Sequence, residues 1–237
     1  MAGAKIQTMI RINKFLAART GLSRRDADKA VDEGRVLING KLPEGSGAQV
    51  SDTDVVTLDG KEVTSDEGFF YWAFYKPRGV LTAYGDGHGK DTLDIYPFLK
   101  EKKPAYSGRL DYDSEGLIIF SNDGDFIRRL QQAEERIEKE YIATVSRVLK
   151  KAELEEMQKG ITYEGVQYRE CFVEQHSHDR YRVVLHEGKK RQVRYMFRHF
   201  GVRVLKLKRV RIGTVNLNEL KKGEYREFSP RELREML

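Results

Sequence analysis

Two carboxylates next to an apolar stretch are the residues of this chain best placed to do chemistry. Asp111 and Asp113 lie in the string GRLDYDSEGLIIFSNDG, which runs from Gly108 to Gly124. Acidic and small residues lead there directly into a run that is typical of a buried strand, so we expect both aspartates at the rim of a sheet. A carboxylate in that position could act as a nucleophile or stabilise a developing positive charge.

The same string is open to two other interpretations. The spacing Asp111-x-Asp113-x-Glu115-Gly116 resembles the opening of a calcium loop, but the twelfth position is Asn122, where a bidentate Glu is required. A polar turn with Asx hydrogen bonds is the default interpretation of such a string taken alone. The rest of the chain offers no set of residues with metal-ligand spacing, so we expect no metal site.

The densest charge in the chain runs from Lys189 to Arg211, where ten residues are Lys or Arg and none is Asp or Glu. Such runs usually form a solvated face, but ten cations without an interleaved anion would repel one another at no evident gain. We therefore favour a phosphate-binding surface. Its expected cations are Lys190, Arg191, Arg194 and Arg198 on or beside one face of a helix, and Lys206 and Lys208 on a strand.

A basic unit precedes these residues. Ile12, Phe15 and Leu16 predict a first helix that ends at Gly21, and Ser23 begins a second one. Short strands turning at Asn39-Gly40 and Asp59-Gly60 follow. Nine basic and four acidic residues lie between positions 5 and 41, which favours contact with a phosphate backbone. The candidate contacts are Arg24, Arg25, Lys29, Arg35 and Lys41.

The polar stretch 64–68 reads as a linker, after which the aromatic content rises sharply. We therefore predict two domains, at 9–66 and 68–237. The first is a small helix-helix-sheet module, and the second is a mixed, mostly antiparallel sheet with helices, so the fold class is α+β. Strands are predicted at 71–75, 117–121, 141–145, 171–175 and 181–186, with Lys206 and Lys208 alternating with Leu205 and Leu207 in a further one, and helices at 126–132, 152–159 and 192–200.

Composition limits the classes of function. The chain has 237 residues, a formal charge of +6 and an isoelectric point near 9.2. It has no apolar run long enough to span a membrane, so we expect a cytoplasmic protein. The single cysteine, Cys171, excludes an internal disulfide and favours a structural thiol. Because a cationic surface would repel a copy of itself, we expect a monomer.

Several strings together resemble one family, the bacterial ribosomal RNA pseudouridine synthases of the small-subunit-enzyme (RsuA-like) type. GRLDYDSEGLIIFSNDG resembles the signature of that family, and Lys76-Pro77-Arg78-Gly79, Lys139-Glu140-Tyr141 and HEGKKRQVRYMFRHFG agree in order. The tail RVRIGTVNLNELKKGEYREF also resembles the end of these enzymes. The N-terminal string SRRDADKAVDEGRVLING resembles the alpha-L RNA-binding motif that precedes their catalytic domain.

The resemblance implies a role for individual residues. Asp111 aligns with the catalytic aspartate, Tyr141 with the tyrosine that packs against the target base, and Arg194 with the basic residue that pairs with the aspartate. Arg109 aligns with the arginine that fills the space left by the extruded base. Lys76 joins the RNA-binding set. The family works without metal or organic cofactor. Tyr195 stands where many relatives have an arginine, which should alter RNA contacts more than chemistry.

The expected function is isomerisation of one uridine of ribosomal RNA, in free RNA or in an assembling ribosomal subunit. The base must leave its stack to reach a buried aspartate, and stacking on Tyr141 would offset part of that cost. Ser114 in the signature favours large-subunit over small-subunit RNA. Whether the aspartate attacks the sugar or the uracil ring stays open. The rival functions are a non-catalytic RNA-binding or ribosome-assembly protein on the same fold, and a glycosylase or hydrolase.

Overall fold

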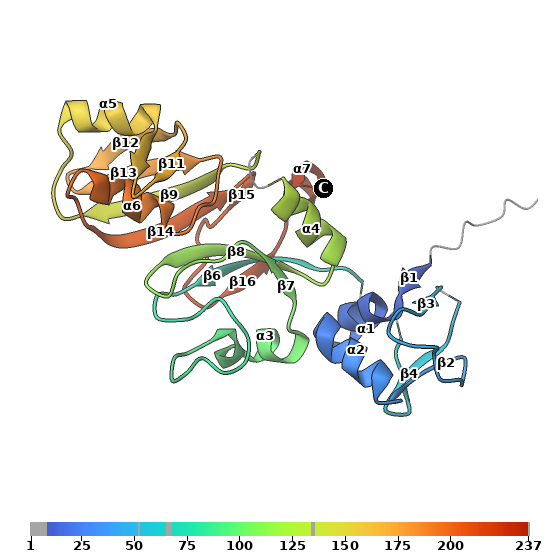
Figure 1. Cartoon of the computed structure of the whole chain (residues 1–237). Helices are drawn as coiled ribbons and strands as arrows, with labels where there is room; N and C mark the ends of the chain where they lie inside the picture. The colour runs from blue at the N-terminus through green and yellow to red at the C-terminus, as the bar shows by residue number, and fades with distance from the viewer. Residues whose placement is uncertain (1–8, 52, 65–67, 134–135, 237) are drawn as a thin grey trace, which may run out of the picture.

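The chain folds into two lobes in the computed structural model, which describes residues 9–51, 53–64, 68–133 and 136–236 (Figure 1). After a two-residue strand that was not predicted, the N-terminal lobe has the predicted order of two helices followed by small strands. Most of the predicted linker, residues 65–67, lies outside the described residues. The elements of this lobe are β1 (Ile10–Arg11), α1 (Ile12–Thr20), α2 (Arg24–Asp32), β2 (Val36–Ile38), β3 (Gln49–Val50), β4 (Val56–Leu58) and β5 (Lys61–Glu62).

Local sequence explains the N-terminal lobe. Ile12 and Leu16 are fully buried in its core, and Gly21 ends α1 in the left-handed conformation at φ 69°. The Ser23 hydroxyl accepts a hydrogen bond from the backbone N–H of Asp26, which caps α2 as predicted. These signals are local, so they could be recognised without knowing the rest of the fold.

One large mixed sheet forms the second lobe. Its strand order is β12-β13-β9-β14-β8-β6-β16, with β7 beside β8 and β15 beside β14. Every pair is antiparallel except β8 with β14, which confirms the predicted α+β class. The elements are β6 (Tyr71–Lys76), η1 (Leu93–Ile95), α3 (Pro97–Lys102), β7 (Ala105–Ser107), β8 (Glu115–Ser121), α4 (Gly124–Gln132), β9 (Lys139–Val145), α5 (Lys151–Lys159), β10 (Ile161–Tyr163), β11 (Val166–Tyr168), β12 (Phe172–Ser177), β13 (Arg180–Leu185), α6 (Gln192–His199), β14 (Val204–Ile212), β15 (Val215–Asn216), β16 (Tyr225–Glu227) and α7 (Pro230–Met236).

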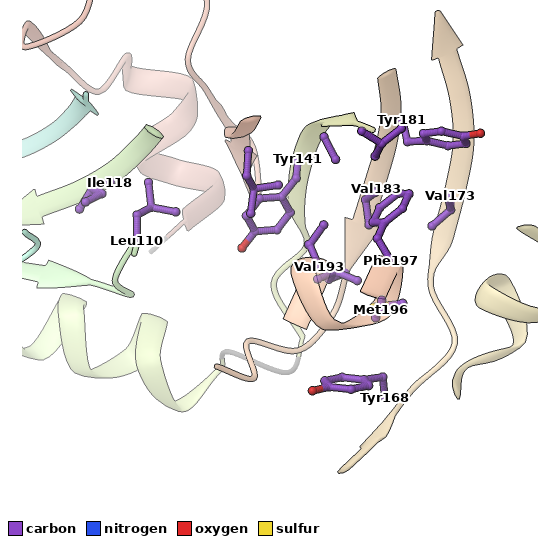
Figure 2. Packing of buried hydrophobic residues seen from close by; sticks show 14 of the residues in the cluster. Leu110, Ile118, Tyr141, Tyr168, Val173, Tyr181, Val183, Val193, Met196 and Phe197 are labelled. Atoms are coloured by element: carbon purple, nitrogen blue, oxygen red, sulfur yellow. The ribbon is translucent and has the colours of Figure 1, made fainter. Parts of the chain in front are cut away.

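Both faces of the sheet are buried, so β6 and β8 are almost continuously apolar. Trp72 and Phe74 point to one face and pack in the same cluster as Phe197 of α6. Ala73 points to the other face, together with Phe126 of α4. Residues of α3, α5 and α6 contribute to the first cluster, part of which Figure 2 shows. The helices thus form a layer on each side of the sheet.

The two halves of the sheet meet at a narrow junction. β8 and β14 pair in parallel through Lys208 with Glu115 and Arg209 with Gly116. Gly116 has φ +122°, and a Cβ on it would lie 2.2 Å from the carbonyl oxygen of Arg209. Only glycine permits this approach of the two backbones. The junction therefore depends on the absence of a side chain at position 116.

One predicted alternation is wrong at the start of β14. Leu207 is buried and Lys206 is exposed as expected, but Leu205 is 45 % exposed. The register between β14 and β9 shifts between Val204 and Lys206, which is the signature of a β-bulge. A bulge inserts one residue and breaks the strict alternation of faces, and nothing in the local sequence predicts it.

The N-terminal lobe contacts the second lobe through α1 and the residue that follows it. Lys14 of α1 forms an ion pair with Asp125 at the start of α4. A Cβ on Gly21, just after α1, would lie 2.6 Å from the carbonyl oxygen of Glu101 in α3. The first helix therefore lies close to both α3 and α4, which cover opposite faces of the sheet (Figure 1).

Replacing Gly116 by alanine should push β8 and β14 apart where they pair. We expect Gly116→Ala to lower the free energy of unfolding of the second lobe by roughly 3 to 5 kcal/mol, because a clash adds to the strain of a positive φ. The measurement is urea unfolding followed by the fluorescence of Trp72, the single tryptophan of the chain. The matched control is Gly165→Ala, at φ +76° with no atom within 4 Å of the added Cβ, which should cost only about 1 to 2 kcal/mol. Equal losses in the two variants would contradict this role of the junction.

Candidate active site

A cavity of about 590 Å³ lies where the two halves of the sheet meet. Asp111 reaches it from the loop before β8, Tyr141 from β9 and Arg209 from β14. Arg191, at the start of α6, and the exposed Arg109 also line it, and the other charged residues of its wall are Lys139, Glu187, Lys189 and Lys190. The second lobe thus brings together four segments that are far apart in the sequence, and the predicted Asp111, Tyr141 and Arg109 share one cavity.

Arg191 holds the two aspartates. Its guanidinium lies 3.5 Å from a carboxylate oxygen of Asp111. It also donates two hydrogen bonds to the carboxylate of Asp113, at 3.3 and 3.2 Å. Such a two-point contact fixes direction as well as charge. Arg191 was predicted only as an RNA contact, and in the structure it is the cation closest to Asp111.

Arg194 pairs with a different aspartate from the one expected. Its guanidinium lies 3.3 Å from the carboxylate of Asp113 and donates to the backbone carbonyl of that residue at 2.8 Å and to the hydroxyl of Ser114 at 3.0 Å. A further bond, at 3.0 Å, goes to the carbonyl of Val204. The prediction that Arg194 pairs with Asp111 is therefore wrong, because its side chain, only 10 % exposed, is hydrogen-bonded to the turn after Asp111.

Charge and burial act in opposite directions on these groups. Burial raises the pKa of Asp113, but the hydrogen bond from Arg191 and the charges of Arg194 and Arg191 outweigh it and hold that pKa below its ordinary value. Burial lowers the pKa of Arg194, although the nearby carboxylate charges of Asp113 and Asp111 oppose the shift. An arginine stays charged in either case. The cluster therefore keeps Asp113 ionised at neutral pH.

Tyr141 is buried at the back of the cavity, with 9 % of its surface exposed. It lies opposite Arg209 of β14 in the antiparallel register, so the two side chains are neighbours on one face of the sheet. Figure 2 shows its ring between Leu110 and Val193, which belong to the same apolar cluster. An aromatic ring held in this way is a fixed surface against which a planar group could pack.

Lys76 was predicted to bind RNA, and the structure shows that this is wrong. The side chain is fully buried. Its ammonium donates to the carbonyl oxygens of Pro77 at 2.8 Å and Val80 at 2.7 Å, which closes the turn after β6. Burial, together with the charge of Arg209, lowers the pKa of Lys76 to about 8. The motif lysine therefore supports the turn from inside and cannot reach a phosphate.

The remaining predicted RNA contacts are mostly exposed. Arg35 is exposed, but it makes two hydrogen bonds of 2.7 and 2.6 Å to Asp59, so its charge is already paired. Lys208 is half-buried, with its ammonium 5.0 Å from the centre of the Tyr75 ring. The other exposed cations of the predicted set are Arg24, Arg25, Lys29, Lys41, Lys190, Arg198 and Lys206.

Sequence reasoning missed two features of the site, the contacts of Arg191 and the place of Arg209 in the cavity wall. Both residues belong to the cationic run that was noticed as a whole. The periodicity of α6 and β14 could have shown that Arg209 shares a face with Leu207, but not that this face lines a cavity. Long-range packing decides which cations of a run turn inward.

No other type of site competes in the part of the chain that the structure describes. The described residues contain no group of three or more His, Cys, Asp or Glu side chains placed to hold a metal ion. None of the described helices has the length and apolar character to cross a membrane. Burial raises the pKa of Cys171 to about 12, so this thiol is a poor nucleophile. The aspartate cavity is thus the candidate active site.

Comparison with known proteins agrees with the geometry. The family model described as RNA pseudouridylate synthase matches residues 70–199, and the S4 domain model matches residues 10–56. The chain is 34 % identical to the ribosomal large subunit pseudouridine synthase B of Bacillus subtilis, over 96 % of either protein. It is 34 % identical to the dual-specificity RNA pseudouridine synthase RluF of Escherichia coli, over 94 % of this chain and 77 % of that protein.

Two further similarities cover nearly the whole chain. The ribosomal small subunit pseudouridine synthase A of Pasteurella multocida is 30 % identical, over 94 % of this chain and 98 % of that protein. A crystal structure of a pseudouridylate synthase superposes with a TM-score of 0.67 at 29 % identity, covering 96 % of this chain and all of that one. Both lobes are therefore similar to those of known proteins.

The ion pairs of Asp113 predict a pH dependence of stability. The pKa of Asp113 is depressed in the folded state, so its contribution is present in full above the unfolded pKa, about 3.9, and is lost as the pH falls through the folded value. Arg191→Gln removes the hydrogen bonds that lower this pKa. We expect the difference in unfolding free energy between the native protein and the variant to be largest at neutral pH and to shrink below about pH 4.

Urea unfolding at a series of pH values measures this difference. Arg198→Gln is the matched control, because Arg198 lies exposed on the same helix, and its effect should not change over that pH range. A gap between the native protein and Arg191→Gln that stays constant down to pH 3 would contradict the pairing of Arg191 with Asp113.

Proposed function

Because the chain belongs to the RNA pseudouridine synthases and carries an N-terminal S4 domain, we propose that it isomerises a specific uridine of ribosomal RNA, with Asp111 as the attacking or charge-stabilising group. The observation that carries the proposal is the shared cavity of Asp111, Tyr141 and Arg191. A binding protein would have no need to place an ion-paired carboxylate beside a buried aromatic ring in a cavity of this size.

Asp111 is the group that bonds to the substrate or stabilises its charge, at the sugar or at the base. The glycosidic bond between C1′ and N1 must break, the freed uracil must turn, and C5 must bond to C1′ while the proton of C5 leaves and N1 gains one. A carboxylate can form a bond to the substrate or stabilise the sugar cation. The side chain of Asp111 is about one-third exposed, and its one ion pair with a described residue is with Arg191 at 3.5 Å. The ion pair thus holds the carboxylate of Asp111 in place and leaves part of it free to contact a substrate.

Tyr141 and Arg109 suit the extruded base and the gap that it leaves. A uridine must flip out of its stack to enter the cavity, at a cost of a few kcal/mol. The buried Tyr141 ring offers a surface for packing against the uracil, which offsets part of that cost. Arg109 is exposed at the cavity wall, where its side chain can reach the vacated stack. Arg194 holds the Asp113–Ser114 turn that follows Asp111.

Large-subunit ribosomal RNA is the proposed substrate. The relative from Bacillus subtilis that matches over nearly its whole length is named a large-subunit synthase, and the identity to it, 34 %, exceeds the 30 % to the small-subunit synthase of Pasteurella multocida. Ser114 in the signature favours the same substrate. We further propose that the protein acts in the cytoplasm as a monomer, on free RNA or on an assembling subunit.

The S4 lobe and α6 supply the cations that hold the RNA backbone. The exposed Arg24, Arg25 and Lys29 lie on α2, and Lys41 follows the turn after β2. The exposed Lys190, Arg198 and Lys206 belong to the second lobe. Each contact with a phosphate releases counterions, so affinity from these contacts falls as salt rises. The specific uridine would then be selected by the cavity and its flanks rather than by these cations.

Asp111→Asn tests the proposed chemistry. The variant should fold and bind ribosomal RNA as the native protein does, and it should lose isomerisation entirely, because an amide can neither attack nor stabilise a cation as a carboxylate does. The measurement is tritium release from large- and small-subunit RNA labelled at C5 of uridine. Asp113→Asn serves for comparison: it should lower stability and reduce turnover without abolishing it, since Asp113 acts on the turn rather than on the substrate.

Three results would contradict the proposal. Measurable turnover by Asp111→Asn would remove this residue from the catalytic role. No tritium release by the native protein from free RNA or from partly assembled subunits would favour a non-catalytic RNA-binding or assembly protein. Release of free uracil would indicate a glycosylase, in which water completes the reaction.

Lys190→Gln with Arg198→Gln tests the cationic surface. The double variant should bind ribosomal RNA more weakly, and the slope of log affinity against log salt should fall by roughly 1.4, the value for two contacts with single-stranded RNA. Turnover at saturating RNA should be unchanged, because neither residue contacts Asp111. Lys159→Gln, on the exposed surface of α5, is the control and should leave the slope unaltered. An unchanged slope in the double variant would place the RNA elsewhere.

A further inference from the structure

Arg209 is a buried cation without a carboxylate partner. It is 3 % exposed, and no carboxylate of the described residues lies within ion-pair distance of it. Its Nε donates to the carbonyl oxygen of Leu117 at 2.8 Å, and the buried Nη2 has no hydrogen-bond partner. A buried charge is normally paired, because an unpaired one costs several kcal/mol. Arg209 therefore has an N–H donor that no group of the described residues accepts from.

The position is the wall of the catalytic cavity. Arg209 lines the cavity together with Asp111 and Tyr141. It lies opposite Tyr141 in the register of β14 with β9, so its side chain is beside the ring proposed to pack on the uracil. A Cβ on Gly108 would lie 3.5 Å from Nη1 of Arg209, so the guanidinium is directly behind the loop that carries Asp111. The spare donor is thus next to the place of the flipped base.

Two other cations of the cavity wall, Arg109 and Lys190, are exposed to solvent, and two more are paired with carboxylates. Arg191 is bound to Asp113 and Asp111. Lys189 lies 3.0 Å from the carboxylate of Glu187. The buried Lys76 adds a second positive charge near Arg209, since the charge of Arg209 contributes to the lowered pKa of that lysine. The inner wall of the cavity is therefore positive, and Arg209 has donor capacity left for a ligand.

We propose that Arg209 contacts the uracil ring and stabilises the negative charge that develops on it during the reaction. This inference rests on the proposed function. If the carboxylate of Asp111 meets C1′, the electron pair of the broken bond to N1 stays on the uracil and is shared with its carbonyl oxygens. If it adds to the ring, the charge collects on O4. In both routes a guanidinium donor beside a carbonyl oxygen lowers the barrier, and the charge disappears when C5 has bonded to C1′, the C5 proton has left and N1 has gained a proton.

The assignment explains why Arg209 has no carboxylate partner. A permanent anion beside the guanidinium would cancel its charge before the substrate arrives. In a cavity closed by the RNA, a fixed cation acts more strongly than it would in water, and it needs no reorganisation when charge appears. The bond to Leu117 holds the guanidinium in place on the rigid sheet.

The test compares two leaving groups under single-turnover conditions. Arg209→Met should bind RNA with unchanged affinity and convert uridine about 10²- to 10³-fold more slowly than the native protein. RNA that carries 5-fluorouridine at the target position gives a uracil anion stabilised by fluorine, which needs less help. The loss caused by Arg209→Met should therefore be at least about tenfold smaller with this RNA, measured as the rate of disappearance of 5-fluorouridine.

Arg209→Lys keeps the positive charge and controls for the possibility that Arg209→Met loses activity through misfolding. It should lose less activity than Arg209→Met and show the same direction of leaving-group dependence. Asp111→Asn is the matched control and should be inactive with both RNAs. An equal loss with uridine and 5-fluorouridine in both Arg209 variants would overturn the assignment and leave Arg209 with a structural role, whereas a native protein that forms no pseudouridine would overturn the proposed function itself.

Discussion

The close approach of two backbones at Gly116 and Arg209 is the constraint on which the site depends. β8 carries the loop of Asp111, and β14 lies between that strand and β9, which carries Tyr141. Among the described strands of the large sheet, the one parallel pairing joins β8 to β14 through two residue pairs. With a side chain at position 116 the strands would move apart, because a Cβ there would lie 2.2 Å from the backbone of Arg209. The aspartate and the aromatic ring would then no longer share one cavity.

The carboxylate of Asp113 decides how the arginines of the site are arranged. Asp113 takes two hydrogen bonds from Arg191 and an ion pair from Arg194, and its backbone carbonyl takes a further bond from Arg194. Asp111 keeps one ion pair, at 3.5 Å. Asp113 thus anchors the start of α6 to the loop, and Asp111 is left with carboxylate oxygens that can meet a substrate. Two neighbouring acids of the same string have different tasks because only one of them is enclosed by cations.

Much of this arrangement could be predicted from the sequence, and the failures have physical causes. Caps, apolar runs and glycine turns act locally, so the Ser23 cap, the end of α1 at Gly21 and the strand at 71–75 were predictable. Lys76 becomes buried, and Arg194 pairs with Asp113 rather than Asp111, only when distant strands of the sheet pair. Local sequence does not contain that information. Of the site residues taken from the family resemblance, Asp111, Tyr141 and Arg109 line one cavity, whereas Arg194 contacts the turn after Asp111. What the strings alone could not predict is which cation contacts which carboxylate.

The distribution of positive charge suits an RNA substrate, which has permanent negative charge on its phosphates and transient negative charge on the reacting uracil. Phosphates are negative at all times and lie outside the base stack, so exposed cations such as Lys190 and Arg198 suit them and are screened by salt. The uracil ring is neutral when it enters and carries charge only while its bonds rearrange. A cation that serves it must be inside the cavity, shielded from water and without a permanent anion, and among the described residues of the cavity wall Arg209 meets these conditions. On the proposed function, exposed and buried arginines of one run would therefore serve different steps, binding in the first case and bond rearrangement in the second.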